Sequence, residues 1–302
     1  MRVSLIHNPT AGAGNVSRDR LIKLLRTMGY NPRYQSTKDP EFPSILDDPL
    51  DLAIAAGGDG TVTKVAVNLP ESNPAIAIIP LGTANNIATD LGIIGTPEEI
   101  IQSWATASRQ SFDLWTASGS WGRRLFLEGC GLGVFTLAAL DMHHREISVS
   151  DPSEKLAIAR HVWRKKVMEC EPIAVSACLG DRVIEGHFLF LEMLNIGFVG
   201  PRLSIAPKIY PTDRWLDLAY LEEEGRSALL EWLDTETTST DIIPITFSRC
   251  QRLNLSWRKS PIRVGDDFFP ETDFDNSQVP QQAKISLAPR TLTILTPKSY
   301  DN

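Results

Sequence analysis

The 302-residue chain has few cysteines, and they follow no pattern typical of a disulfide framework or a zinc site. Cys130, Cys170, Cys178 and Cys250 are scattered along the sequence, and no two of them form a C-x-x-C pair. This spacing excludes a cysteine-rich secreted scaffold and argues against structural zinc. Since free thiols are typical of a reducing compartment, we expect a cytoplasmic protein.

The sequence also lacks an excess of positive charge and any long apolar run. Its formal net charge is −7 at pH 7, so we expect no nucleic-acid partner. No segment approaches the roughly 18 consecutive apolar residues that a membrane-spanning helix needs. The 42% hydrophobic and 22% charged residues are typical of a globular protein with one large domain or two medium ones.

Two familiar nucleotide-binding motifs, the P-loop pattern and the dinucleotide fingerprint G-x-G-x-x-G, are missing around the glycine-rich turns. The chain instead has two apolar segments, 52–56 and 75–79, that are followed by the turns GGDGT (57–61) and GTANN (82–86). A third turn, 8–12, follows the first apolar strand. Turns of this kind direct backbone N–H groups at the carboxyl edge of a parallel sheet, where phosphate binds. The pattern predicts a nucleotide polyphosphate site; ordinary strand-to-helix turns with glycine for packing are the alternative.

Two side chains in the first of these turns have more than one interpretation. Asp59 either holds Mg²⁺ through water or anchors the loop. Thr61 either caps the following helix or donates to a phosphate. The sequence does not choose between these roles.

The order of expected elements predicts two domains. Strands and helices alternate over residues 1–112, which predicts an α/β domain with a parallel sheet covered by helices on both faces. Short strands dominate residues 113–290 and predict a mainly antiparallel β domain, interrupted by helices near 154–169 and 226–233. The C-terminal segment, about 291–302, is expected to pack back on the first domain.

The chain resembles the diacylglycerol kinase catalytic superfamily, which includes bacterial lipid kinases and sphingosine kinases, and more distantly NAD kinase. The residues that carry the resemblance are Asn8-Pro9 with Gly12, GGDGT at 57–61, PLGTANN at 80–86, DLG at 90–92, and segments 129–133, 195–197, 206–207 and 213–217. The resemblance implies an α/β nucleotide-binding domain, a mainly antiparallel β-sandwich lipid-acceptor domain and an active site in the cleft between them. It implies an ATP- and Mg²⁺-dependent lipid kinase that transfers the γ-phosphoryl group to a hydroxyl of a diacylglycerol-like lipid.

The resemblance also assigns candidate binding residues. Those expected to bind ATP are Asn8, Thr37, Gly57, Gly58, Asp59, Gly60, Thr61, Val62, Thr63, Thr83 and Asn85. A structural Mg²⁺ in the second domain is expected on the carboxylate of Asp213 and the backbone carbonyls of Tyr210 and Trp215. The alternative for Asp213 is a turn residue before a strand. Arg214 departs from the family pattern, which has glycine at that position.

The segment that supplies the catalytic base differs from the family pattern. The family has Asp-Gly-Glu where this chain has Gly265, Asp266 and Asp267, so no carboxylate stands at the first position. We expect Asp267 to be the base, with Asp266 as the other candidate; a solvated turn is the alternative. Asn86 is a second departure, because the family has a carboxylate there.

These departures keep other functions open. A catalytically weak or inactive regulatory homologue that binds nucleotide or lipid is the main alternative. A soluble NAD kinase is disfavoured, because Asn85-Asn86 stands where that family has Asn-Glu.

A lipid substrate requires contact with a membrane surface. The segment 154–169 is basic and amphipathic, with Trp163 among its apolar residues, and could bind anionic headgroups at the inner face of the membrane. The alternative is a surface helix that packs its apolar stripe on the β domain. A homodimer is left open.

Overall fold

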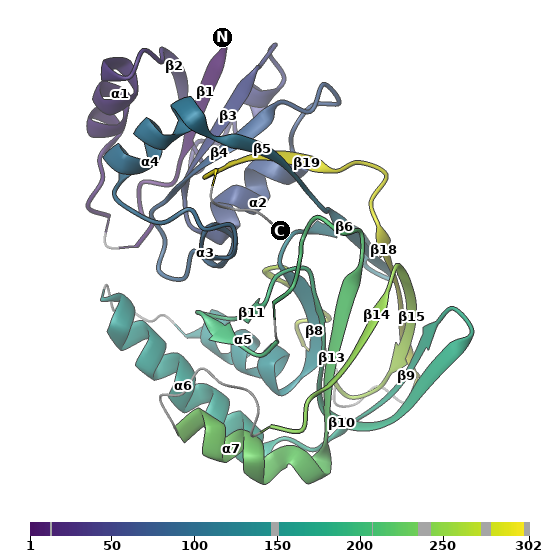
Figure 1. Ribbon diagram of the computed structural model, residues 1–302. Coiled ribbons are helices and arrows are strands. Elements are labelled where there is room, and N and C mark those ends of the chain that lie inside the picture. The colour runs from purple at the N-terminus through teal and green to yellow at the C-terminus, as the bar shows by residue number, and fades with distance from the viewer. Residues whose placement is uncertain (13, 146–150, 207, 235–242, 273–278, 299–302) are drawn as a thin grey trace. The chain divides into compact units, whose positions relative to one another are not determined.

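The computed structural model describes residues 1–12, 14–145, 151–206, 208–234, 243–272 and 279–298. The chain forms two compact units, which Figure 1 shows as a ribbon. The first is Met1–Phe112 with Ser150–Pro152 and Arg290–Asn302, and the second is Asp113–Val149 with Ser153–Pro289. The division after Phe112 coincides with the change from alternating strands and helices to successive short strands.

A six-stranded sheet in the order β2-β1-β3-β4-β19-β5 forms the centre of the first unit. Its strands are β1 (Val3–His7), β2 (Pro32–Ser36), β3 (Leu52–Gly57), β4 (Ala75–Pro80), β5 (Ser108–Phe112) and β19 (Leu292–Thr296). All neighbours are parallel except β19 and β5. Strand β19 brings the C-terminal segment back into this sheet, between β4 and β5.

Helices cover this sheet. They are α1 (Arg18–Thr27), α2 (Asp59–Val67), α3 (Asn86–Asp90), α4 (Pro97–Ser103) and the short 3₁₀ helices η1 (Ser44–Leu46) and η2 (Trp104–Thr106). Every residue of β1 and β3 is buried, so both faces of the sheet are covered. Continuous apolar strands such as LAIAAG are what a parallel sheet between helices requires.

The strand order reverses between β1 and β3. From β1 the chain passes through α1 to β2 on one side, and then returns to β3 on the other side of β1. The backbone N–H of Asn8, just after β1, donates to the carbonyl of Ala56 in β3 at 2.9 Å. In open α/β sheets ligands bind outside the carboxyl ends of the strands at such a reversal. The fold therefore places the first two glycine-bearing turns side by side.

The second unit contains one eleven-stranded antiparallel sheet. Its main path is β17-β16-β8-β10-β9-β15-β18-β6-β7, and β13 pairs with β10 and β14. The strands are β6 (Trp115–Gly119), β7 (Gly122–Phe126), β8 (Gly129–Gly133), β9 (Ile173–Leu179), β10 (Arg182–Leu194), β13 (Leu216–Glu222), β14 (Thr246–Cys250), β15 (Arg252–Trp257), β16 (Ile262–Val264), β17 (Asp267–Phe269) and β18 (Gln281–Leu287); β11 (Phe198–Val199) and β12 (Leu203–Ser204) form a separate pair. The layers that we expected are parts of this single sheet, which curls around its own core (Figure 1).

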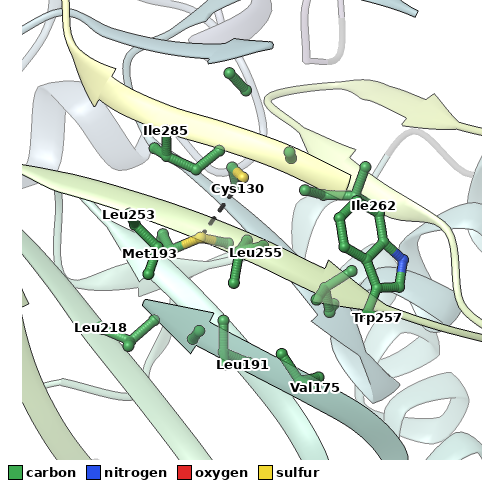
Figure 2. Close-up of a cluster of buried hydrophobic side chains, with 14 of the residues drawn as sticks. Cys130, Val175, Leu191, Met193, Leu218, Leu253, Leu255, Trp257, Ile262 and Ile285 are labelled. Carbon is green, nitrogen blue, oxygen red and sulfur yellow. Dashed lines mark hydrogen bonds between the residues drawn. The ribbon is translucent and has the colours of Figure 1, made fainter. Parts of the chain in front are cut away.

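The two faces of this sheet bury different clusters of side chains. Along β10, Leu191 and Met193 point into an inner cluster with Cys130 and Trp257, which Figure 2 shows. Phe190 and Leu194 point into an outer cluster that the helices cover. This alternation is the period-two pattern of a strand that is buried on both sides.

Three helices cover the outer face, namely α5 (Val134–His144), α6 (Pro152–Glu169) and α7 (Arg226–Asp234), and the 3₁₀ helix η3 (Glu223–Gly225) precedes α7. Helix α5 was not among the helices that the sequence predicts. Its first turns are apolar on every side, from Val134 to Leu140, so they show no 3.6-residue alternation with polar positions.

Helix α6 matches the surface-helix interpretation of segment 154–169. Val162, Trp163 and Val167 are buried in the outer cluster, and Trp163 is only 2% exposed. Among its basic residues, Arg164 pairs with Asp234 at 2.7 Å. Membrane contact through this segment stays a prediction, but the Trp163 ring is not available for it.

Within the described part of the chain, none of the helices is both long and apolar enough to cross a bilayer.

Candidate functional site

Three turns meet at the carboxyl edge of the first sheet. They follow β1, β3 and β4, and backbone hydrogen bonds join them. The N–H of Asn8 donates to Ala56 O, and the N–H of Leu81 donates to Gly57 O, both at 2.9 Å. The N–H of Thr37, after β2, donates to His7 O at 2.9 Å. The candidate nucleotide turns are therefore held at a common edge of the sheet.

Glycine allows these turns to touch backbone to backbone. A Cβ placed on Gly82 would lie 2.4 Å from the Cα of Gly58. A Cβ on Gly12, whose φ is +57°, would lie 2.4 Å from the carbonyl oxygen of Leu81. Side chains at these positions would separate the turns and cover their backbone. Close packing of the turns and an uncovered backbone where they meet thus require the same glycines.

Asp59 joins the second turn to the third. It is the first residue of α2, and its Oδ2 accepts the N–H of Asn86 at 3.0 Å while its Oδ1 accepts the N–H of Ile87 at 2.9 Å. Both donors are N–H groups in the first turn of α3, where backbone N–H groups have no acceptor within the helix. Of the two roles left open for Asp59, the structure shows the anchoring one.

Three of the predicted nucleotide residues have structural positions within the turns. Asn85 has a φ of +53°, and its side chain closes the turn, with Oδ1 accepting the N–H of Gly82 and Nδ2 donating to the carbonyl of Gly82, both at 2.8 Å. Thr61 and Val62 are buried at 4% and 1% exposure. The hydroxyl of Thr61 lies under Gly57, where a Cβ would come within 2.2 Å of it.

The other predicted nucleotide residues remain reachable, except Gly57, which is buried at the end of β3. Asn8, Thr37, Gly58, Asp59, Gly60, Thr63 and Thr83 are partly buried. A cavity of about 220 Å³ lies between the β1 turn, from His7 to Val16, and Leu81–Gly82. It is the space between the turn after β1 and the turn after β4.

His7 lies at this cavity and was missed as a functional candidate. It is the last residue of β1, is 1% exposed, and has its Nδ1 3.3 Å from the hydroxyl of Tyr34. Burial lowers the pKa of His7, because the charged imidazolium is poorly solvated there. The sequence signal was its position directly before the Asn-Pro turn.

The lowered pKa of His7 predicts a pH-dependent stability. The unfolded chain binds the proton more readily than the folded chain, so the stabilisation is complete above about pH 6.5 and is lost as the pH falls below that value. We expect a His7→Gln variant to lose less unfolding free energy than the parent between pH 7 and pH 5, as urea unfolding would measure. The matched control is His187→Gln, an exposed histidine of β10, which should leave the pH slope unchanged. Equal slopes for parent and His7→Gln would contradict the assignment.

In the second unit the candidate bases lie on the hairpin between β16 and β17. Val264 pairs with Asp267, so Gly265 and Asp266 form a two-residue turn, and Gly265 has a φ of +58°. Both aspartates are exposed. Oδ2 of Asp267 lies 3.4 Å from Nε of Arg124. Gly265 occupies the first position of the turn, so the carboxylate within the turn is that of Asp266, at the second position.

A buried ion pair lies behind this turn and was not predicted. Nη1 of Arg263 donates to Gly265 O at 3.2 Å, and Nη2 donates to Oε2 of Glu192 at 2.9 Å. Glu192 is fully buried, and its Oε1 has no hydrogen-bond partner among the described residues. Burial raises the pKa of the Glu192 carboxyl, although Arg263 acts in the opposite direction. A lone glutamate in the apolar run FLFLEML was the available signal.

The carboxylate predicted to hold Mg²⁺ in the second unit is paired with an arginine. Oδ1 of Asp213 accepts the N–H of Trp215 at 2.9 Å, and Oδ2 forms an ion pair with Nη2 of Arg249. The N–H of Asp213 donates to Tyr210 O at 3.3 Å. In the described residues there is no group of three or more His, Cys, Asp or Glu side chains that could hold a metal. These residues do not fit a bound Mg²⁺, because a guanidinium lies against the one carboxylate assigned to the ion.

Arg214 is held in a backbone conformation that favours glycine, with φ +64°. Its N–H donates to Oδ2 of Asp113 at 2.6 Å, and the N–H of Asp113 donates to Pro211 O at 2.6 Å. Burial raises the pKa of the Asp113 carboxyl. The family's glycine at position 214 thus has a physical reason, and this chain tolerates the strain.

Comparisons with known proteins agree with this architecture. Residues 2–117 match the model of the diacylglycerol kinase catalytic domain. A diacylglycerol kinase of Staphylococcus epidermidis is 35% identical over 277 residues, which cover 84% of this chain and 82% of that protein. A Stenotrophomonas maltophilia protein named "Probable lipid kinase YegS-like" is 29% identical over 186 residues, covering 59% of this chain and 58% of its own length. That second match thus spans less than two thirds of the relative.

Solved structures show the same fold. A diacylglycerol kinase of Bacillus anthracis superposes with a TM-score of 0.72 at 19% identity, covering 99% of this chain and 98% of the other. An NAD kinase of Archaeoglobus fulgidus in complex with ATP superposes with a TM-score of 0.57 at 13% identity, covering 99% and 95%. The turns at the edge of the first sheet, the shared fold and the long match to the staphylococcal enzyme lead to one conclusion: the chain belongs to the diacylglycerol kinase family.

Proposed function

We propose that this protein is an ATP- and Mg²⁺-dependent lipid kinase that phosphorylates a hydroxyl of a diacylglycerol-like lipid. The observation that carries the proposal is the junction of three glycine-bearing turns at the edge of the first sheet, with Asp59 joining two of them. Relatives that bear the names diacylglycerol kinase and lipid kinase support the reaction class.

The nucleotide phosphates are proposed to lie along these turns. Backbone N–H groups at strand ends favour negative charge, and glycine at positions 58 and 82 adds no Cβ where the two turns meet. The 220 Å³ cavity beside Asn8 extends this surface. When bound, Mg²⁺ would neutralise part of the phosphate charge. Asp59 is the carboxylate within the turns that would help to hold the ion. The turns therefore suit a nucleotide polyphosphate, and Asp59 would hold the ion in addition to anchoring the start of α3.

Asp267 is the proposed acceptor of the proton that leaves the lipid hydroxyl, with Asp266 as the second candidate. Both carboxylates are exposed: Asp266 is in the two-residue turn, Asp267 directly follows it, and Arg263 holds the turn backbone through the Gly265 carbonyl. A general base has to reach the hydroxyl proton within hydrogen-bond distance, and an exposed carboxylate in or next to a short, fixed turn is suited to this. Asp267 already has a cationic neighbour in Arg124.

The kinase reaction itself is the direct test. Purified protein, labelled ATP and Mg²⁺ should transfer phosphate to a lipid in mixed micelles that present a panel of diacylglycerols, sphingoid bases and other lipid alcohols. A folded protein that binds ATP but labels no lipid in the panel would contradict the proposal.

Replacing Asp267 by asparagine should lower kcat by roughly 10²- to 10⁴-fold, because the base is lost while the side-chain shape is kept. The affinity for ATP, measured by calorimetry, should not change. Asp181→Asn is the control for removing an exposed hairpin aspartate, since Asp181 follows Gly180, with its φ of +66°, as Asp266 follows Gly265. If Asp266→Asn abolishes transfer and Asp267→Asn does not, the base is Asp266.

A regulatory protein without turnover is the second candidate. It is favoured by the neutral, buried Asn86 and by the absence of a carboxylate at position 265. It predicts that ATP raises the melting temperature although no lipid is labelled. NAD kinase remains the third candidate because of the shared fold, and product analysis with NAD as the acceptor would identify it.

A further inference from the structure

We propose that Arg249 is a built-in cation that takes the place of a divalent metal ion in the second unit, so that this unit is stable without metal and the loss of Arg249 creates a metal site. The feature concerned is the carboxylate pair of Asp213 and Asp217. Arg249 bridges the two, with Nη2 paired to Asp213 Oδ2 and Nε lying 3.2 Å from Asp217 Oδ1.

Strand register places the arginine there. Asp217 in β13 is directly opposite Arg249 in β14, and Asp213 precedes the strand by one tight turn. Directly opposed side chains of antiparallel strands lie close enough to pair, and the planar guanidinium can donate to two carboxylates at once. One side chain thus pairs with the carboxylates at both ends of the turn.

The surroundings resemble a metal site in which the Arg249 guanidinium occupies the position of the cation. The carboxylates of Asp213 and Asp217 pair with one guanidinium and so lie near each other, and hard oxygen ligands are what Mg²⁺ and Mn²⁺ require. The Arg249 side chain is 44% exposed, whereas those of Asp213 and Asp217 are 27% and 15% exposed. The carboxylates are therefore the more enclosed partners, and the guanidinium lies over them from the solvent side, 5.8 Å from the ring of Trp215.

The enclosed carboxylates need a cation. Both carboxylates pair with the same guanidinium, and their side chains are only 27% and 15% exposed. Without the guanidinium, two neighbouring carboxylates would face each other across a half-buried turn. A divalent ion would then relieve the same repulsion that Arg249 relieves now.

The turn that Arg249 holds also supports the first residue of the second unit. Arg214, within the turn, donates its N–H to Asp113, and Asp113 donates its N–H to Pro211. Removal of the Arg249 side chain should therefore lower the stability of the second unit and not only change the turn locally.

The experiment compares the parent with Arg249→Gln and Arg249→Ala in nucleotide-free buffer of constant ionic strength. The parent should melt at the same temperature, within about 1 °C, in EDTA and in millimolar MgCl₂ or MnCl₂. The variants should melt lower in EDTA, and Mg²⁺ or Mn²⁺ should restore ~5 °C or more at a hundredfold excess over the dissociation constant. Mn²⁺ titration followed by electron paramagnetic resonance should detect one additional bound ion per variant chain.

Two controls separate this proposal from a simple loss of a surface ion pair. Arg252→Ala removes an exposed arginine at the start of β15 and should change neither the melting temperature in EDTA nor Mn²⁺ binding. Asp213→Asn added to Arg249→Gln should abolish the rescue by metal. The proposal is overturned if chelation destabilises the parent, or if the Arg249 variants fold but gain no metal binding. Arg249→Lys, which keeps the charge, provides the folded comparison if the other variants do not fold.

Discussion

Replacement of Gly82 by alanine should weaken ATP binding by about 100-fold or more and lower the free energy of unfolding by about 2–4 kcal/mol. The added Cβ would lie 2.4 Å from the Cα of Gly58 and 2.9 Å from Oδ1 of Asn85. Neither neighbour can give way, because one is backbone and the other is held by two hydrogen bonds to Gly82 itself. The two turns would separate, and their N–H groups would no longer face the same phosphates.

Gly29→Ala is the matched control for this variant. Gly29 follows α1 and has a φ of +83°, and a Cβ added there would meet no other atom within 4 Å, so alanine adds backbone strain without a clash. It should cost about 1 kcal/mol and leave ATP affinity unchanged. Urea unfolding and calorimetric ATP titration measure the two effects. ATP affinity of Gly82→Ala within a few-fold of the parent would show that the phosphates bind elsewhere.

Arg263→Leu should lower the free energy of unfolding by about 3–5 kcal/mol. Removal of the guanidinium leaves the Glu192 carboxylate fully buried, with neither oxygen paired, since Oε1 has no partner even in the intact protein. The carboxyl group would have to take up a proton or remain charged in an apolar setting, and either outcome destabilises the folded state.

The double variant Glu192→Leu/Arg263→Leu should recover most or all of this loss. Apolar side chains of similar volume often replace a buried ion pair without a net cost. Its kinase activity should still be low, because the Gly265 carbonyl loses its donor and the Asp266–Asp267 turn is less fixed. Arg252→Leu, on an exposed position, is the control for introducing leucine. A double variant less stable than Arg263→Leu alone would contradict the expected coupling.

Much of the first unit could be predicted from the sequence because its signals are local. Apolar runs such as LAIAAG define buried strands, and the glycines after them mark turns whose backbone must come close to something else. The change of rhythm near Phe112 marks the boundary of the second unit. The family resemblance adds the assignment of the turns to a nucleotide, which local patterns leave open.

The features that the sequence did not predict depend on pairings between distant residues. Asp59 accepts N–H groups from residues 27 and 28 positions later, and Arg249 meets Asp213 only because β14 pairs with β13. Glu192 and Arg263 are 71 residues apart and come together because β8, with Gly131, lies between their strands. Helix α5 was not predicted because its first turns are mainly apolar and so lack an amphipathic pattern.

Local chemistry in the chain was thus enough to define where strands end, where the backbone must turn, and which turns suit phosphate. Only the tertiary structure shows which groups the charged side chains pair with. Asp59 anchors the start of α3, Asp213 pairs with the Arg249 guanidinium, and Glu192 pairs with Arg263. The physical reason is that backbone propensity acts over a few neighbouring residues, whereas the partner of a buried or half-buried charge is set by strand register and packing.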